Sequence, residues 1–451
     1  MLSLKHLCVL LLVLAIGLAG NAQQWAASSA TDTLVINRAA YADRLEGFWL
    51  GACIANWTGL VTEMDKIGNI GEIRTGDFYT RADWGQPDHP SIFNPDSPSD
   101  LSPTIDFVFR GPDSIWGADD DTDIEYMYQY LLAESPTPLL TPEQIRKGWL
   151  RHIRTGEENY LWVSNQKALD LMQEGVLPPQ TSAPNLNEHW EMIDAQLTTE
   201  IFGLFAPGRP DVALRLAHLP IRTTARSQAA HIAEFYVVMH ALAPLADTSR
   251  PKGEVVFGMA EAARSHLTDS GYAGKMYDFV KSKFDSGIPW EQTRDSIYQR
   301  YQVDELDGYH ITSQNLYCNG CFAAGINFAA SLVSLFYGKG DFKETIKIGT
   351  LCGWDSDNPT ATWGGLLGFL SGKKQIEALF GRKFSDRFNI HRTRQNFPRD
   401  GIDTFPNMAQ TGLGIIDRVV PELMQGHQDA GGNNWHIPLG EFPGMPKRKT
   451  D

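Results

Sequence analysis

Two short aspartate-rich segments carry the residues best suited to chemistry. The first, Asp119-Asp120-Asp121-Thr122-Asp123, places four carboxylates in five positions, and the second is Asp355-Ser356-Asp357-Asn358. Apolar segments flank the second cluster, so its carboxylates need hydrogen bonds, ion pairs or a cation to offset their lost hydration. An alternating Asp-x-Asp directs two carboxylates towards one point, as hard divalent cations such as Mg²⁺ or Ca²⁺ require. The pattern therefore indicates an oxygen-liganded metal site.

A solvated helix N-terminus is a second interpretation of the first cluster, because acidic residues are favoured there without any metal. A single Asp-x-Asp also occurs in many turns. Two such clusters at the starts of predicted helices favour a metal site over these simpler explanations. Since the clusters lie far apart in the chain, the fold must bring them together.

Three tryptophans are candidates for substrate contact. Trp116 and Trp354 flank the two clusters, and Trp84 belongs to a loop rich in proline and aromatic residues. Each could stack on a sugar or an adenine, and each could equally pack in the core. Cys318 and Cys321 form a lone C-x-x-C, which favours a disulfide or an inert pair over a redox or metal role.

The elements that must position these residues are mainly helices. Few segments have strand character, and an almost wholly apolar run at 321–337 predicts a central helix. Apolar spacing predicts helices over 37–54, 124–132, 142–154, 213–219, 229–243, 258–267, 276–283, 289–301, 321–337, 342–349 and 364–368. We expect an all-α fold with one large helical domain at 37–425, interrupted by a long functional loop at 75–112.

The ends of the chain indicate where the protein is located, and its charge restricts the classes of partner. Residues 1–22 combine one lysine, an apolar stretch and small residues, which predicts a signal peptide and a secreted or periplasmic protein without a membrane span. Residues 23–36 are predicted to be a leader and 426–451 a C-terminal tail. Loss of Lys5 with the signal peptide changes the net charge from −15 to −16. Such an excess of negative charge argues against nucleic acid or an anionic membrane as partner, and the oligomeric state stays open.

Three motifs in this order resemble the signatures of the ADP-ribosylglycohydrolase family. The family's G-D-x-x-G-x-x-x-E pattern is matched within Gly51 to Glu63, with Asn56 at the aspartate position. Its Thr-Asp-Asp-Thr is matched at 119–122, with aspartate at the first threonine position. Its G-G-D-[TS]-D-T is matched at 353–358, and the G-G-L-L-G at 364–368 is similar to the family's G-A-L-x-G. The resemblance covers about residues 40–375.

The resemblance implies an all-α domain with a dimetal site in a central cleft. It implies two divalent cations, with Mg²⁺ expected and Mn²⁺ or Ca²⁺ as alternatives. The principal ligands would be Asp120, Asp121, Asp355 and Asp357, completed by Asp119, Asn358 and Glu63. Glu63 and Asp121 are the two candidates for general base, and the sequence does not choose between them.

The resemblance also implies a glycosyl hydrolase in which metals hold the vicinal hydroxyls of a ribose-like furanose and position a water for attack at the anomeric carbon. An ADP-ribosyl adduct is one substrate class. A furanoside of an extracellular glycan is the alternative, which predicted export, the aromatic loop and Trp354 favour. A third interpretation is an inactive carbohydrate- or metal-binding protein, in which Asn56, Asp119 and Asn358 mark lost catalysis. A basic diphosphate-binding pocket would separate the first class from the second.

Overall fold

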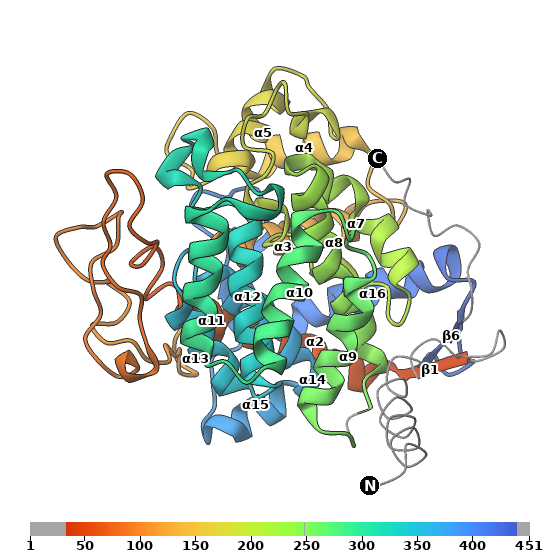
Figure 1. Cartoon of the computed structure of the whole chain (residues 1–451). Coiled ribbons are helices and arrows are strands. Elements are labelled where there is room, and N and C mark those ends of the chain that lie inside the picture. The colour runs from red at the N-terminus through yellow and green to blue at the C-terminus, as the bar shows by residue number, and fades with distance from the viewer. Residues whose placement is uncertain (1–32, 248, 440–451) are drawn as a thin grey trace, which may run out of the picture.

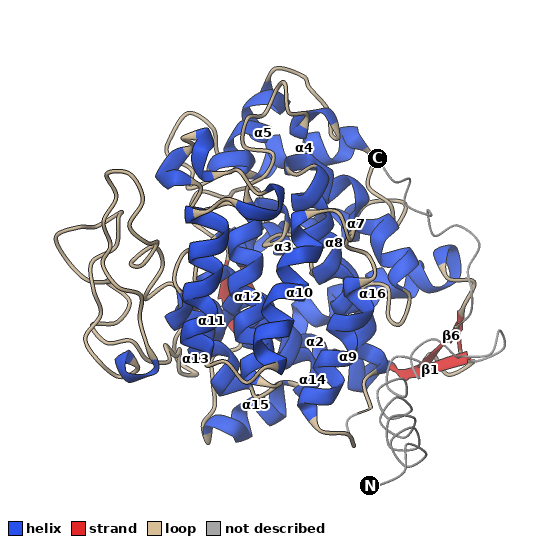
Figure 2. Cartoon of the chain, viewed as in Figure 1, coloured by secondary structure: helices blue, strands red, loops and turns tan. Residues whose placement is uncertain are grey.

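The computed structural model consists mainly of α-helices, which confirms the predicted all-α fold (Figure 1, Figure 2). The structure describes residues 33–247 and 249–439. The predicted signal peptide, most of the predicted leader and the end of the predicted tail lie outside the described residues. None of the helices in the described chain is both long and apolar enough to span a membrane.

Two antiparallel helices, α2 (Arg38–Gly59) and α14 (Asp357–Ser371), form the centre of the fold. Asn37 caps the start of α2 by accepting a hydrogen bond from a backbone amide of the first turn. Glycines let the two backbones touch, because a Cβ built on Gly51 would lie 2.2 Å from the carbonyl oxygen of Gly364. The last turn of α2 therefore lies beside the first turn of α14, where the second aspartate cluster is found.

Other helices surround this pair. Helices α3, α13, α15 and α16 contact α2, while α12 packs on α13 and α14 and is buried at almost every position, as its apolar run predicts. These five helices are α3 (Asp120–Glu134), α12 (Ala324–Gly338), α13 (Phe342–Cys352), α15 (Lys373–Phe380) and α16 (Phe405–Leu423). The other helices of the described chain are α4 (Pro142–His152), α5 (Val163–Gln173), α6 (Ile201–Leu204), α7 (Pro210–Thr224), α8 (Ser227–Leu242), α9 (Lys252–Arg264), α10 (Tyr272–Asp285) and α11 (Trp290–Ile297).

The structure differs from the predicted helices in a few places. The predicted helix at 289–301 divides into α11 and a π-helical segment, Tyr298–Val303. Helices α5, α6, α15 and α16 were not predicted. In α16, Pro406 and Pro421 interrupt the pattern, but Pro406 stands in the first turn, where a missing amide hydrogen does no harm.

The predicted long loop is present and projects from one side of the helices (Figure 1). Between α2 and Trp116 the chain forms only turns, an isolated bridge and one short 3-10 helix, Arg81–Asp83. At residue 116 it enters a small sheet of β2 (Trp116–Gly117), β3 (Arg387–Asn389) and β4 (Ile402–Thr404), with β2 parallel and β4 antiparallel to β3. Strand β2 delivers the chain to the first aspartate cluster at the start of α3.

The two ends of the described chain pair with each other. Strand β6 (Asn434–Pro438) lies between β1 (Thr33–Asn37) and β5 (His427–Gln428) in an antiparallel sheet, and Leu34 is opposite Ile437. The sequence placed 33–36 in a leader and 427–438 in a tail, so the structure corrects both boundaries. These ends pair because β6 buries Trp435 and Ile437 in the core, and a free tail would leave both side chains exposed.

Candidate metal centre

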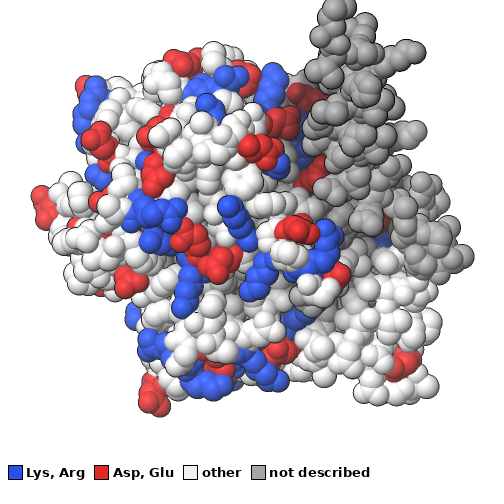
Figure 3. Space-filling view, turned by 60° about the horizontal axis from the view of Figure 1, so that its bottom comes forward, with Lys and Arg blue, Asp and Glu red and all other residues white. Residues whose placement is uncertain are grey.

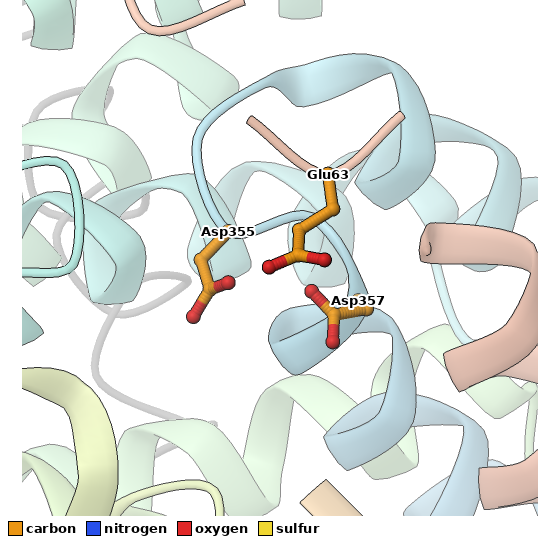
Figure 4. A group of neighbouring side chains, drawn as sticks. All are labelled: Glu63, Asp355 and Asp357. Carbon is orange, nitrogen blue, oxygen red and sulfur yellow. The ribbon is translucent and has the colours of Figure 1, made fainter. Parts of the chain in front are cut away.

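Carboxylates from both aspartate clusters meet in one place. Glu63, Asp355 and Asp357 each offer an oxygen within 4.8 Å of the others, and so do Asp119, Asp121 and Asp357. Asp357 belongs to both groups and therefore stands between two adjacent sites. In the first group the side chain of Glu63 points at the two aspartates (Figure 4). The fold thus brings together the two clusters that the sequence singled out.

Backbone hydrogen bonds hold the Glu63 loop against the turn that carries the second cluster. The amide of Met64 donates to the carbonyl of Trp354 (2.9 Å), and the amide of Trp354 donates to the carbonyl of Lys66 (2.9 Å). The turn needs glycine at Gly353, which has a φ of 98° and whose Cβ would lie 2.5 Å from the Lys66 carbonyl oxygen. Glu63 is therefore placed by the same turn that places the aspartates.

Asp119 links the first cluster to helix α2. Its side chain caps α3 by accepting a hydrogen bond from the amide of Asp121 (3.2 Å). The side-chain amide of Asn56 donates to both carboxylate oxygens of Asp119 (3.1 and 3.0 Å). Asp119 is consequently held by two elements before any cation is considered.

Asn358 was predicted to be a metal ligand, and the structure gives it another role. Its side-chain oxygen accepts a hydrogen bond from Gln196 (3.0 Å), and its side-chain amide donates to Asp121 (3.0 Å). Asn358 therefore positions the Asp121 carboxylate, and its side-chain oxygen, which has a second lone pair, stays a candidate ligand. Asp120, also a predicted ligand, lines the same pocket but belongs to neither three-carboxylate group.

The donor atoms at this centre suit hard divalent cations. All five group members offer carboxylate oxygen, the ligand type that Mg²⁺, Mn²⁺ and Ca²⁺ prefer over nitrogen or sulfur. One oxygen of Asp357, Oδ1, is buried and has no hydrogen-bond partner in the described part of the chain. An enclosed carboxylate oxygen without a donor is unfavourable unless a cation compensates it. The residues present therefore fit one or two such cations.

Burial raises the pKa of every carboxyl in the two groups above its usual range, and repulsion from Asp357 raises the pKa of Glu63, Asp119, Asp121 and Asp355 further. Without a cation, the centre therefore takes up protons. Cations must displace these protons, so we expect the affinity for divalent cations to increase with pH.

This electrostatic arrangement predicts a pH-dependent effect of metal removal on stability. Because the pKa values are higher in the folded than in the unfolded chain, their stabilising contribution is full below about pH 4 and is lost as pH rises. With a chelator, the melting temperature should therefore decrease between about pH 5 and about pH 8, and Mg²⁺ should restore it mainly at the higher pH. Thermal unfolding at both pH values, with NaCl of equal ionic strength as control, measures this effect. An equal benefit of Mg²⁺ at both pH values would contradict it.

The structure contradicts the substrate contacts predicted for two tryptophans. The indoles of Trp354 and Trp116 are fully buried, and their Nε1 atoms donate to Gln302 (2.7 Å) and to the Ser385 carbonyl (3.0 Å), respectively. With both ring faces enclosed, neither can stack on a ligand. Trp84 packs edge-on against another aromatic ring of the long loop and does not line the carboxylate pocket.

Other residues line the pocket that the carboxylates form, here called the acidic pocket. They include Trp162, Phe322 and Asp194. The Trp162 ring lies nearly parallel to those of Phe93 (5.5 Å between centroids) and Phe322 (6.3 Å), and Trp162 is 38% exposed. None of these residues was predicted from the sequence to belong to the site. Phe93 belongs to the long loop that was predicted to be functional, but no motif marks Trp162, Phe322 or Asp194.

Two of the cysteines close a disulfide. Cys318 and Cys321 are bonded, with their Cα atoms 5.5 Å apart, which selects the disulfide among the roles that the sequence left open. Cys53 and Cys352 are free and buried. The disulfide immediately precedes Phe322, so it lies next to the aromatic wall of the acidic pocket.

Most of the chain is similar to known proteins. The model of the family described as ADP-ribosylglycohydrolase matches residues 37–400. Among solved structures, one named "ADP-ribosylglycohydrolase-related protein complex" is 15% identical with a TM-score of 0.47, over 84% of this chain and 99% of that chain. No curated protein matches the chain.

Proposed function

The chain belongs to the ADP-ribosylglycohydrolase family, and on this premise we propose that it is a metal-dependent hydrolase that cleaves a bond at the anomeric carbon of a ribose-like furanose. The family match supports a hydrolase acting on glycosyl or ADP-ribosyl bonds. The observation that carries the metal is the sharing of Asp357 by two groups of three carboxylates. We also propose export to the periplasm or the medium, which rests on the pattern of residues 1–22 alone.

The carboxylates have different proposed roles, which follow from their surroundings. Asp119, Asp121, Asp355 and Asp357 would hold one or two divalent cations, with Glu63 at the open side. Such a cation supplies Lewis-acid chemistry, by which it orients hydroxyl groups and lowers the pKa of water. The four aspartates belong to structured turns and helix starts, so they provide a rigid frame for that chemistry.

Glu63 is the better candidate of the two proposed general bases. It is only partly buried and lines both the acidic pocket and a second pocket beneath the long loop, so water reaches it from two sides. Asp121 is buried, and its carboxylate already accepts a hydrogen bond from Asn358. In hydrolysis, Glu63 would take a proton from the attacking water and return it to the leaving atom, so that the proton balance closes.

The test is hydrolysis by the mature protein of ADP-ribosyl-arginine, ADP-ribosyl-serine and aryl furanosides, with Mg²⁺, Mn²⁺, Ca²⁺ or a chelator. We expect turnover of at least one compound, and a loss of at least about 10²-fold on chelation, because a bound cation contributes several kcal/mol to such transition states. Addition of the cation back to the chelated sample is the control for irreversible unfolding. A cation-loaded protein that cleaves none of these compounds would favour the interpretation as a binding protein.

A further inference from the structure

A second pocket adjoins the acidic pocket through Trp162, which lines both. This side pocket has a volume of about 360 Å³ and is formed by residues 155–162 and by Gln166, Asp170 and Gln173 of α5. The acidic pocket itself offers only about 20 Å³, enough for a water or a cation and not for a sugar ring. A substrate that presents a bond to the carboxylates must therefore rest mainly outside the acidic pocket. Two pockets adjoin it, and the side pocket is larger than the one beneath the long loop, which has a volume of about 90 Å³.

The side pocket has the groups that bind uncharged sugars. Tyr160 and Trp162 are each 38% exposed, and aromatic faces pack well against the C–H face of a sugar ring. The side chains of Glu158 and Gln173 and the Tyr160 hydroxyl make no hydrogen bond within the described residues, so they are free to bond sugar hydroxyls. The pocket therefore combines apolar ring faces with unpartnered polar groups.

Neither pocket offers positive charge. No lysine or arginine lines the acidic pocket or the side pocket among the described residues. The nearest cations stand outside the lining of both pockets: Arg154 pairs with Glu157 (3.3 Å), and Arg392 lies over the Tyr160 ring (4.5 Å). The centre holds six carboxylates, which belong to Glu63, Asp119, Asp120, Asp121, Asp355 and Asp357. Their combined negative charge exceeds the four positive charges of two divalent cations.

Backbone amides at a helix N-terminus can bind phosphate, and at two helix starts near the site an amide already binds a carboxylate of the chain. In the first turn of α5, the amide of Asn165 donates to the carboxylate of Asp194 (2.8 Å). At the start of α3, the amide of Asp121 donates to Asp119. These two helix ends thus already hold the chain's own carboxylates, and a diphosphate bound at either would have to displace them.

The protein does have a basic cavity, but it lies at the other end of α2 and α14. That cavity has a volume of about 680 Å³ and is lined by Arg44, Arg250, Lys252 and Lys374. Lysine and arginine also gather, among acidic residues, on the face of the molecule that Figure 3 brings forward. The length of α14 alone separates the two ends by roughly 20 Å, at 1.5 Å per residue. The positive charge of this cavity is therefore remote from the carboxylates.

We propose that the side pocket binds an uncharged sugar unit, and that the substrate is a neutral, furanose-bearing glycan instead of a diphosphate-bearing ADP-ribosyl adduct. The part of this inference that concerns cleavage rests on the proposed hydrolase function. The part that concerns the bound sugar rests on the side pocket alone. Repulsion from the carboxylates disfavours a phosphate group in this position, and no lysine or arginine among the described residues lines either pocket to offset it.

Binding tests the proposal separately from cleavage. The probes are methyl β-D-ribofuranoside, its 5-phosphate and an arabinofuranosyl trisaccharide, titrated into the Mg²⁺-loaded protein and followed by tryptophan fluorescence and by ligand-observed NMR. We expect the uncharged ribofuranoside to bind at least about tenfold more tightly than its 5-phosphate at low salt, and the difference to shrink at high salt. Equal or tighter binding of the 5-phosphate would overturn the proposal.

Two variants locate the effect in the side pocket. Tyr160→Ala should weaken binding of the uncharged probes about tenfold, because a stacking face is lost. Glu158→Lys should strengthen binding of the 5-phosphate about tenfold at low salt. Glu143→Lys makes the same charge change at an exposed position of α4 outside both pockets, and it should not have this effect. Cation-dependent cleavage of ADP-ribosyl-arginine without cleavage of any furanoside would overturn this inference and leave the hydrolase function standing. Cleavage of no compound would overturn the hydrolase function, and the relative affinities of the two ribofuranosides would still decide what the pocket prefers.

Discussion

Replacement of Asp357 by asparagine is expected to lower kcat/KM for cation-dependent hydrolysis by about 10³-fold or more, because about 4 kcal/mol of transition-state stabilisation is lost with a shared ligand. Asp357 is the one residue that belongs to both three-carboxylate groups. Asparagine has nearly the same shape but no charge, so the substitution removes a charged metal ligand and leaves the packing unchanged. Steady-state kinetics measures the loss of activity, and titration with the cation by calorimetry measures how many cations the variant still binds.

The same substitution should stabilise the cation-free protein. Asp357 raises the pKa of its four neighbours by repulsion, so removing its charge relieves that repulsion. A higher melting temperature together with lost activity cannot be explained by misfolding. Asp285→Asn, an exposed aspartate that pairs with Lys281, is the matched control and should alter neither property. A folded Asp357→Asn protein with nearly full activity would show that the shared position is not a ligand.

The acidic centre could be predicted from the sequence because its signal is local. Asp-x-Asp and the run at 119–123 place several carboxylates within a few residues, and helical apolar spacing follows each of them. Crowded carboxylates next to buried helices require compensation in any fold, so composition and spacing suffice to indicate a cation site. Which oxygens take part depends on hydrogen bonds over long sequence separations, such as those of Asn358 to Gln196 and Asp121, and spacing does not reveal these.

Trp354 illustrates how a neighbour in sequence can point away from a site. The residue directly precedes Asp355 and was predicted to contact substrate for that reason. Its backbone has a φ of 58°, a conformation that turns the indole into the core, where it packs against Phe78 (4.9 Å between centroids) and is fully buried. Trp162 does line the pocket, although it lies in a segment without helical periodicity, and only tertiary packing brings it there.

Two departures from the family pattern turn out to be partners in space. The sequence has Asn56 where the resemblance places an aspartate, and Asp119 where it places a threonine. In the structure, the Asn56 amide donates to both oxygens of Asp119. The pair therefore keeps one carboxylate and one neutral partner and moves the charge from α2 to the start of α3. This arrangement argues against the interpretation of the two replacements as independent marks of lost catalysis.

The contact between α2 and α14 is the structural requirement for the whole centre. Glu63 follows the end of α2, and Asp357 is the first residue of α14, so the separation of these two helices sets the separation of the two side chains. A Cβ on Gly364 would lie 2.3 Å from the Cβ of Ala55 and 2.5 Å from the Gly51 carbonyl oxygen. Neither contact can be relieved by rotation of a flexible side chain, because both involve atoms on or next to the α2 backbone.

Gly364→Ala should therefore lower the free energy of unfolding by about 3 kcal/mol, at the upper end of the cost of overpacking a core, despite the better helix propensity of alanine. It should also weaken cation binding, because α14 can accept the methyl group only by moving away from α2. Gly414→Ala on α16 is the matched control: it is a helical glycine whose added Cβ would meet nothing within 4 Å, and it should stabilise the protein by about 0.5 to 1 kcal/mol. Urea unfolding and cation titration of the two variants measure both effects. If the two alanines proved equally stable and bound cations equally well, close contact between α2 and α14 would not be what holds the carboxylates together.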